Sequence, residues 1–250
     1  MNRNFTIGIT TFPRRFEMFK EQILKIRSVC DNEILVQVNQ FYKIKDEEYR
    51  RNILKFCSEI SNIFVTIYPT FTSLSKMWNQ IVINSSNDII FSVSDDVNFI
   101  NDEWLVNIYN ELESFSGFKI LNNTFSTFLI SKNVLDDIGY FDERLLAYGE
   151  EDGDFVWRYI KQFGVYPQVS YINNFYNIGE GYGIEPPNLR FIQIGNVIRP
   201  AFNREWCFTE KYSHESDNPI GMFGTPMKCN ILNEKQYPYE KFKLENFNRL

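Results

Sequence analysis

The first 94 residues alternate between short β-rich runs and stretches of helical periodicity, and this alternation limits the fold more than any other feature. Four runs are rich in Ile, Val and Phe and are expected to form strands, over residues 5–10, 33–38, 63–68 and 89–93. Between them, apolar residues recur every three or four positions, as they do in amphipathic helices. Strands that alternate with helices build a mostly parallel sheet covered by helices, so the sequence predicts an α/β fold.

Helix caps support this interpretation. Ser73 is a good N-cap for a helix that runs to about residue 84, and Asp102 is expected to cap a helix over 103–114. The sequence beyond that helix predicts one more strand and one short helix, over 124–130 and 132–138.

Composition excludes several classes of protein. Acidic residues outnumber basic residues by 32 to 26, and a formal charge of -6 makes a nucleic acid an unexpected partner. The four cysteines lack the paired spacing of a zinc site or a redox dithiol, and reduced thiols suit a cytoplasmic protein. We expect neither a signal peptide nor a membrane span, because no apolar run approaches the roughly 18 residues that a span requires.

The fourth predicted strand is followed by two adjacent acids, Asp95 and Asp96. Ligands of open α/β sheets bind at the carboxyl ends of the strands, so residues 10–15, 39–40 and 94–96 are expected to meet in one crevice. Two neighbouring carboxylates raise each other's pKa unless a positive charge compensates them, and Mg²⁺ or Mn²⁺ is the expected compensation. The alternative is that the pair only caps the turn before the next helix.

A second acidic cluster, Glu150-Glu151-Asp152 with Asp154, precedes an amphipathic helix. Carboxylates are favourable at a helix N-terminus, and Asp154 is expected to pair with Arg158 one turn later. Three consecutive acids are harder to explain, because each repels the next. One of them is therefore a candidate general base.

Three motifs in this order resemble the family 2 type of GT-A glycosyltransferases, over roughly residues 4 to 165. ITTFPRR is similar to the segment after that family's first strand, and SVSDDVNFINDEWL is similar to its acidic metal motif. FDERLLAYGEEDGDFVWRY resembles its FDE turn and ED-x-D helix. The resemblance implies a GT-A, Rossmann-like, mostly parallel sheet flanked by helices, in a single domain with a C-terminal extension.

The resemblance also implies roles at the matching positions. Thr10, Thr11, Phe12 and Arg14 would lie near the nucleoside, Asp95 would contact the ribose or the metal, and Asp96 would bind Mn²⁺ or Mg²⁺. Asp152 would be the catalytic base, with Glu151 as the alternative, because counting from FDER and counting from Arg158 differ by one residue.

Two positions depart from the family pattern. Asn39-Gln40 replaces the Asp that often follows the second strand, and Ser94 replaces the first acid of the usual acidic triple. Both can still form hydrogen bonds, so we assign Asn39 and Ser94 to donor binding and leave the nucleobase open, with a UDP-sugar favoured. His214, the one histidine, is a further candidate metal ligand, and the alternative is a solvated loop residue.

The implied function is the inverting transfer of a hexose from a nucleotide-diphosphate sugar to a glycan or lipid-linked acceptor, for a bacterial surface glycan. Residues 1–200 would be the transferase domain, with a donor-binding half of about 1–100, an acceptor half of about 101–200, and an extension over 201–250 of open role. The alternatives are a non-catalytic binder and a sugar nucleotidyltransferase; the latter needs a glycine-rich loop where this chain has TTFPRRF. Weak peripheral membrane contact and the oligomeric state stay open.

Overall fold

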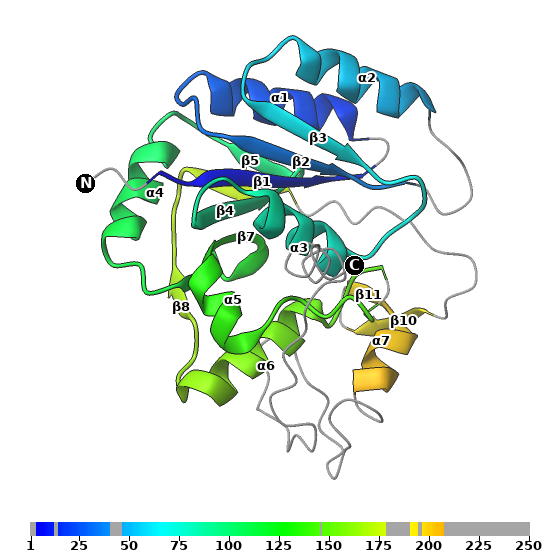
Figure 1. Cartoon of the computed structure of the whole chain (residues 1–250), viewed down its shortest axis with the longest axis vertical. Helices are drawn as coiled ribbons and strands as arrows, with labels where there is room; N and C mark the ends of the chain where they lie inside the picture. The colour runs from blue at the N-terminus through cyan, green and yellow to red at the C-terminus, as the bar shows by residue number, and fades with distance from the viewer. Residues whose placement is uncertain are drawn as a thin grey trace, which may run out of the picture. The chain divides into compact units, whose positions relative to one another are not determined.

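The computed structural model describes residues 4–12, 15–40, 47–145, 147–178, 191–194 and 197–207 (Figure 1). The chain forms two compact units. The sheet unit consists of Met1–Phe71, Gln80–Asn133 and Gln168–Ile184. The second unit consists of Thr72–Asn79, Val134–Pro167 and Glu185–Leu250.

A seven-stranded sheet in the order β3-β2-β1-β4-β7-β6-β8 forms the centre of the sheet unit. Only β7 runs against the others, since it pairs antiparallel with both β4 and β6. The sequence prediction of a mostly parallel sheet is therefore confirmed. The strands are β1 (Thr6–Thr11), β2 (Ile34–Val38), β3 (Ile63–Ile67), β4 (Ile89–Ser94), β6 (Phe118–Leu121), β7 (Thr124–Ser131) and β8 (Gln168–Ser170).

Helices cover this sheet, and α1 (Phe16–Arg27) and α2 (Glu47–Ser58) lie on the same face of β1–β3 (Figure 1). On α1, Phe19 and Ile23 are fully buried, whereas Leu24 is half exposed, as expected for a helix with one apolar face. α4 (Trp104–Glu113) contributes the buried Trp104, whose ring centroid lies 4.6 Å from that of Phe99.

A short second sheet of the same unit pairs β5 (Val97–Phe99) with β9 (Phe175–Asn177). This pairing holds the segment that follows β4, because the amide of Ile178 also donates to the carbonyl of Asp96 at 2.9 Å. The turn that carries the acidic pair is thus held on both sides.

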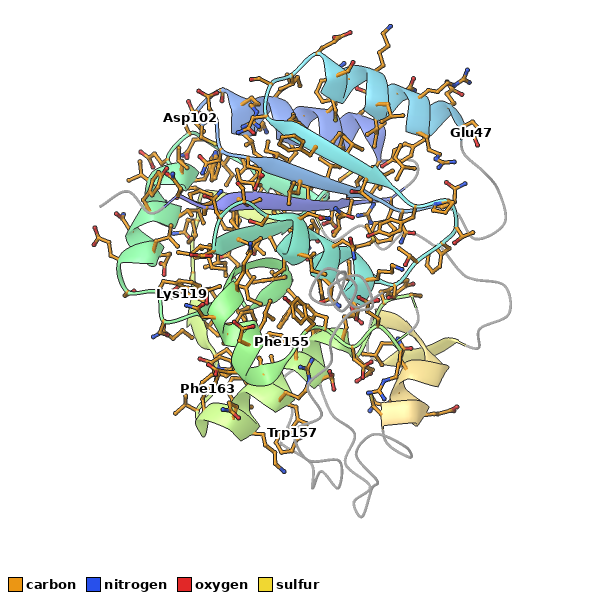
Figure 2. The ribbon with its side chains drawn as sticks, in the orientation of Figure 1. Glu47, Asp102, Lys119, Phe155, Trp157 and Phe163 are labelled. Atoms are coloured by element: carbon orange, nitrogen blue, oxygen red, sulfur yellow. The ribbon has the colours of Figure 1, made fainter. Side chains whose placement is uncertain are left out.

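The second unit contains α6 (Glu151–Phe163), β10 (Phe191–Ile194), β11 (Val197–Pro200) and α7 (Ala201–Trp206). Phe155 of α6 is fully buried and stacks on Phe141, with 4.4 Å between the ring centroids, whereas Phe163 at the other end of the helix is 39% exposed (Figure 2). The predicted Asp154–Arg158 pair is confirmed, with 3.0 Å between Oδ2 and Nη2.

Two helices contain residues of both units: α3 (Leu74–Asn84) and α5 (Lys132–Ile138). The predicted cap of α3 is confirmed, because Ser73 Oγ accepts a bond from the amide of Lys76 at 3.3 Å. The prediction that Asp102 caps α4 is wrong, because the N-cap residue is Glu103. The backbone amide of Glu103 donates to Asn101 Oδ1. Among the described residues, none of the helices has both the length and the hydrophobicity needed to cross a membrane.

Candidate functional site

The acidic pair Asp95-Asp96 directly follows β4, where the strand order of the sheet changes direction. β1 pairs in parallel with β2 on one side and β4 on the other, so that Thr11 lies opposite Val38 and Thr10 opposite Ser94. The carboxyl ends of all three strands therefore lie side by side. In open α/β sheets this switch point is the usual place for a ligand.

Gln22 of α1 fixes the turn at these acids through two hydrogen bonds. Its side-chain nitrogen donates to the carbonyls of Ser94 at 2.7 Å and Val97 at 2.9 Å, on either side of the pair. Gln22 is only 3% exposed, and its amide replaces hydrogen bonds that a tight turn would otherwise make to water.

Arg15 supplies the positive charge that the acidic pair requires. Its Nη1 lies 2.6 Å from Asp95 Oδ1 and 3.5 Å from Asp96 Oδ2, and all three side chains are nearly buried. The sequence argument assigned this compensation to a metal ion. The structure shows that a guanidinium already provides part of it.

Asp95 is also held by the loop after β1. The amide of Phe12 donates to Oδ2 at 3.1 Å, and Thr11 contributes a side-chain hydrogen bond. Burial raises the pKa of the Asp95 carboxyl above its ordinary value, while Arg15, Thr11 and the Phe12 amide act in the opposite direction. Asp95 is therefore the internal anchor of the site, with its oxygens directed at protein groups.

Thr10 and Thr11 are both buried, with exposed fractions of 1% or less. The hydroxyl of Thr11 lies 2.5 Å from that of Tyr49 on α2, which ties the end of β1 to this helix. The two threonines were assigned to the nucleoside; their side chains lie within the protein framework that would shape such a pocket.

The end of β2 carries two buried amides, Asn39 and Gln40. Asn39 Oδ1 accepts a bond from the amide of Gln40 at 2.9 Å, and the amide of Asn39 donates to the carbonyl of Thr11 at 3.0 Å. Within the part of the chain that the structure describes, neither polar atom of the Gln40 side chain has a hydrogen-bond partner. A buried amide without partners is costly, which marks Gln40 as a candidate ligand contact.

One divalent cation fits the chemistry of this edge, although no group of three or more His, Cys, Asp or Glu side chains gathers within the described residues. Mg²⁺ in sites of this kind is bound by one or two carboxylates together with phosphate oxygens. Arg15 lies closer to Asp95, at 2.6 Å, than to Asp96, at 3.5 Å, so Asp96 is the candidate carboxylate for such an ion beside a diphosphate.

The second acidic cluster lies in the other unit, at the start of α6. Glu150, Glu151, Asp152 and Asp154 are all at most 7% exposed, and Asp152 Oδ1 accepts a bond from the amide of Gly153 at 2.8 Å. Positive charges compensate the ends of the cluster: Arg204 Nη1 lies 3.3 Å from Glu150 Oε1, and Arg158 pairs with Asp154.

Proteins of known structure share this architecture at low sequence identity. Residues 1–349 of TarS from S. aureus, in complex with UDP-GlcNAc, match 72% of this chain at 15% identity, with a TM-score of 0.53. Glucosyl-3-phosphoglycerate synthase from Mycobacterium tuberculosis, in complex with Mn²⁺, UDP and glucosyl-3-phosphoglycerate, matches 70% at 9% identity and a TM-score of 0.53. Mannosyltransferase PcManGT from Pyrobaculum calidifontis, in complex with GDP-Man and Mn²⁺, matches 68% of this chain at 8% identity, with a TM-score of 0.54.

The chain has the GT-A glycosyltransferase fold. The matched regions cover 60% of the TarS chain, 72% of the synthase and 55% of the mannosyltransferase. A scan against models of protein families finds no match, and a search of curated protein sequences finds none either. The predicted fold is confirmed by structure alone.

On this GT-A sheet the structure brings together seven residues that the sequence assigned to the donor or the metal: Thr10, Thr11, Phe12, Asn39, Ser94, Asp95 and Asp96. The two candidate bases, Glu151 and Asp152, belong to the second unit. Arg14 and His214 lie outside the described residues.

The sequence placed Arg15 and Gln40 within the ranges expected to meet in the crevice but assigned them no role, and it did not single out Gln22 or Arg204. Arg15 is the second arginine of the FPRR motif, but the motif alone did not show that this side chain pairs with the acids. Gln22 and Arg204 had no signal in the sequence, because each acts on a segment more than 50 residues away.

Proposed function

We propose that the chain is a glycosyltransferase that moves a sugar from a nucleotide-diphosphate sugar to an acceptor hydroxyl. One observation carries the proposal: Asp95, Asp96 and Arg15 form a buried charged cluster at the switch point of a GT-A sheet. The similar structures hold UDP, UDP-GlcNAc or GDP-Man, which supports a nucleotide-sugar donor.

The donor would bind at the carboxyl ends of β1, β2 and β4. Asp96 would hold Mn²⁺ or Mg²⁺, and the ion would neutralise charge on the leaving diphosphate. Asp95 and Arg15 keep the loop after β1 in place, and the Gln40 amide offers one donor and one acceptor to a nucleobase edge. An amide can pair with several bases in this way, so UDP is favoured by the similar structures and not by Gln40.

The reaction would proceed with inversion. A carboxylate at the start of α6, Asp152 or its alternative Glu151, takes the proton of the acceptor hydroxyl. That oxygen attacks the anomeric carbon as the bond from this carbon to the diphosphate oxygen breaks, so the nucleoside diphosphate leaves from the opposite face. We propose a hexose as the transferred sugar and a glycan or lipid-linked acceptor, as in bacterial surface glycans made on the cytoplasmic side.

A panel of nucleotide sugars with Mn²⁺ or Mg²⁺ tests this function by product formation. Asp96→Asn and Asp152→Asn are each expected to lower kcat by a factor on the order of 100 or more, because they remove charge neutralisation and proton transfer respectively. Asp102→Asn, at an exposed position before α4, is the matched control and should leave kcat unchanged. Full activity of both site variants would refute the assignments.

Glu151→Gln decides between the two candidate bases. If Asp152 is the base, Glu151→Gln should keep most of the activity that Asp152→Asn loses, and the reverse result would move the role to Glu151. Glu59→Gln, at an exposed position after α2, is the matched control for a neutralised glutamate.

A non-catalytic nucleotide binder is the second candidate, because the donor edge of the sheet unit could bind without turnover. It predicts nucleotide-dependent stabilisation with no product from any donor. A glycosyltransferase predicts nucleotide-dependent stabilisation and also product formation.

A further inference from the structure

The helix α7 was part of a C-terminal extension without an expected role, yet it is bonded to the segment before the candidate base. The side chain of Asn203 is completely buried, and its Nδ2 donates to the carbonyl of Gly149 at 2.8 Å and, more weakly, to that of Tyr148 at 3.4 Å. Both partners lie directly before α6 and within the same unit. A residue more than 50 positions away thus holds the turn that leads into α6.

This turn has a conformation that costs free energy. Ala147, Gly149 and Glu150 all have positive φ angles, of 57°, 98° and 74°, and two of these residues are not glycine. Non-glycine residues adopt the left-handed region only when the surrounding structure holds them there. The amide of Leu74 supports Ala147 through its carbonyl at 2.8 Å, and Asn203 supports the next two residues.

Arg204 fixes the last residue of the turn. Glu150 is 2% exposed, and Arg204 Nη1 lies 3.3 Å from its Oε1, which compensates a carboxylate that burial would otherwise destabilise. The carbonyl of Glu150 accepts the amide of Asp154 at 2.8 Å, so this residue also sets the first turn of α6. Glu151 and Asp152 follow it directly.

We propose that Asn203 and Arg204 are positioning residues, which hold the turn 147–150 with its three positive-φ residues in place and thereby orient the carboxylates of Glu151 and Asp152. The expected effect on catalysis rests on the proposed function. The bonds of Asn203 and Arg204 to the turn do not depend on it. A misplacement of about 1 Å of a reacting group can lower a rate on the order of 100-fold, so the effect should appear in kcat. The KM for the nucleotide-sugar donor should not change, because the donor would bind to residues of the other unit.

Steady-state kinetics of Asn203→Ala and Arg204→Gln test the proposal. Each variant is expected to lower kcat by about 10-fold or more, with the KM for the donor within about 2-fold of wild type. Arg204→Lys keeps the charge and should recover most of the loss. Asn52→Ala and Arg51→Gln, exposed on α2, are the matched controls. Unchanged kcat in both Asn203→Ala and Arg204→Gln would overturn the proposal.

A double variant separates positioning from general damage. If Asn203 acts through the base, Asn203→Ala should cost little further activity in an Asp152→Asn background, whereas an equal loss in both backgrounds would show an independent effect and contradict the proposal. Circular dichroism melting of each variant identifies any that fails to fold. If Asn203→Ala fails to fold, Asn203→Ser, which keeps a hydrogen-bond donor, replaces it.

Hydrogen exchange needs no activity and distinguishes failure of this inference from failure of the proposed function. Asn203→Ala should speed exchange of the amides at 149–155 while leaving those of β1 and β4 unchanged. If exchange is faster in the variant but the wild-type protein transfers no sugar, the role of Asn203 in holding the turn is supported and the proposed function is refuted. Unchanged exchange at 149–155 would refute the contact.

Discussion

At the residue scale, Arg15 changes the meaning of the acidic pair. Two adjacent aspartates at a buried strand end first indicated a metal ion, because their charges need compensation. The guanidinium at 2.6 Å from Asp95 and 3.5 Å from Asp96 meets much of that need within the protein. The two acids are therefore not equivalent: Asp95 makes the shorter contact with Arg15 and also accepts the Phe12 amide, and Asp96 is the one that we propose as the metal ligand.

Removing Arg15 should destabilise the fold in a pH-dependent way. Burial already raises the pKa of Asp95, and Arg15 is the strongest of the groups that oppose this rise. An acid whose pKa is higher in the folded state costs stability when ionised, so the cost is full above the folded pKa and disappears below the unfolded pKa of about 4. Arg15→Gln should therefore lose about 3–5 kcal/mol at pH 7 and clearly less at pH 5.

Urea unfolding of Arg15→Gln and wild type at both pH values measures this difference. Arg51→Gln, which removes an exposed arginine from α2, controls for net charge. Adding Asp95→Asn to Arg15→Gln should remove most of the pH dependence. An equal loss at pH 7 and pH 5 would show that Arg15 stabilises by packing and not by compensating Asp95.

At the scale of elements, Gly8 lets α3 approach β1 closely. A Cβ at Gly8 would lie 2.3 Å from Cγ2 of Ile81, which is 1% exposed. Gly8→Ala is expected to cost about 1–3 kcal/mol through overpacking, and Ile81→Ala about 2–5 kcal/mol through the cavity that it leaves. The double variant should be clearly more stable than the sum of the two predicts, because the added methyl fills part of the cavity.

Thermal or urea unfolding of the three variants measures this coupling. Val82→Ala, at the neighbouring buried position on α3, supplies a control that should combine additively with Gly8→Ala. Strict additivity of Gly8→Ala with Ile81→Ala would mean that the strand and helix do not depend on this contact.

Elements with a clear period could be predicted from sequence, including the short helix α5 (Lys132–Ile138), whereas strands of three or four residues could not. β1 to β4 and α3 appeared with boundaries close to those observed, and helices were expected where α1 and α2 lie, because each shows one apolar face or an unbroken β-rich run. The strands β5 and β9 have three residues each, and β6 has four, too few for a period. Their places are set by pairing with distant segments, which a local pattern does not contain.

The candidate site divides in the same way. Asp95 and Asp96 could be placed from sequence, because a strand end at the switch point is a topological position. Their partners could not be placed. Gln22 reaches the turn from α1, and Asn203 reaches another turn from α7, and such contacts depend on how distant segments pack.

At the scale of the whole molecule, ligand binding should raise the stability of the fold. With UDP and Mn²⁺ at about 100 times the dissociation constant, binding adds about 2.7 kcal/mol, which is on the order of 5–10 °C in Tm for a chain of this size. Asp96→Asn should lose the part of this shift that depends on Mn²⁺. Differential scanning fluorimetry with UDP, GDP and uridine, with and without Mn²⁺, measures it.

Uridine separates recognition of the base from recognition of the diphosphate. A shift with uridine equal to that with UDP would place the binding energy on the base and argue against Asp96 as a phosphate–metal ligand. No shift with any nucleotide would contradict both the transferase and the nucleotide binder.

The two units are interleaved along the chain. Three segments form each unit and they alternate, so the backbone passes from one unit to the other five times, at the junctions after Phe71, Asn79, Asn133, Pro167 and Ile184. One crossover between two related genes therefore cannot exchange either unit intact. A chimaera designed to swap the segment around α6 needs α7 from the same parent, because Asn203 and Arg204 bond to the turn before α6.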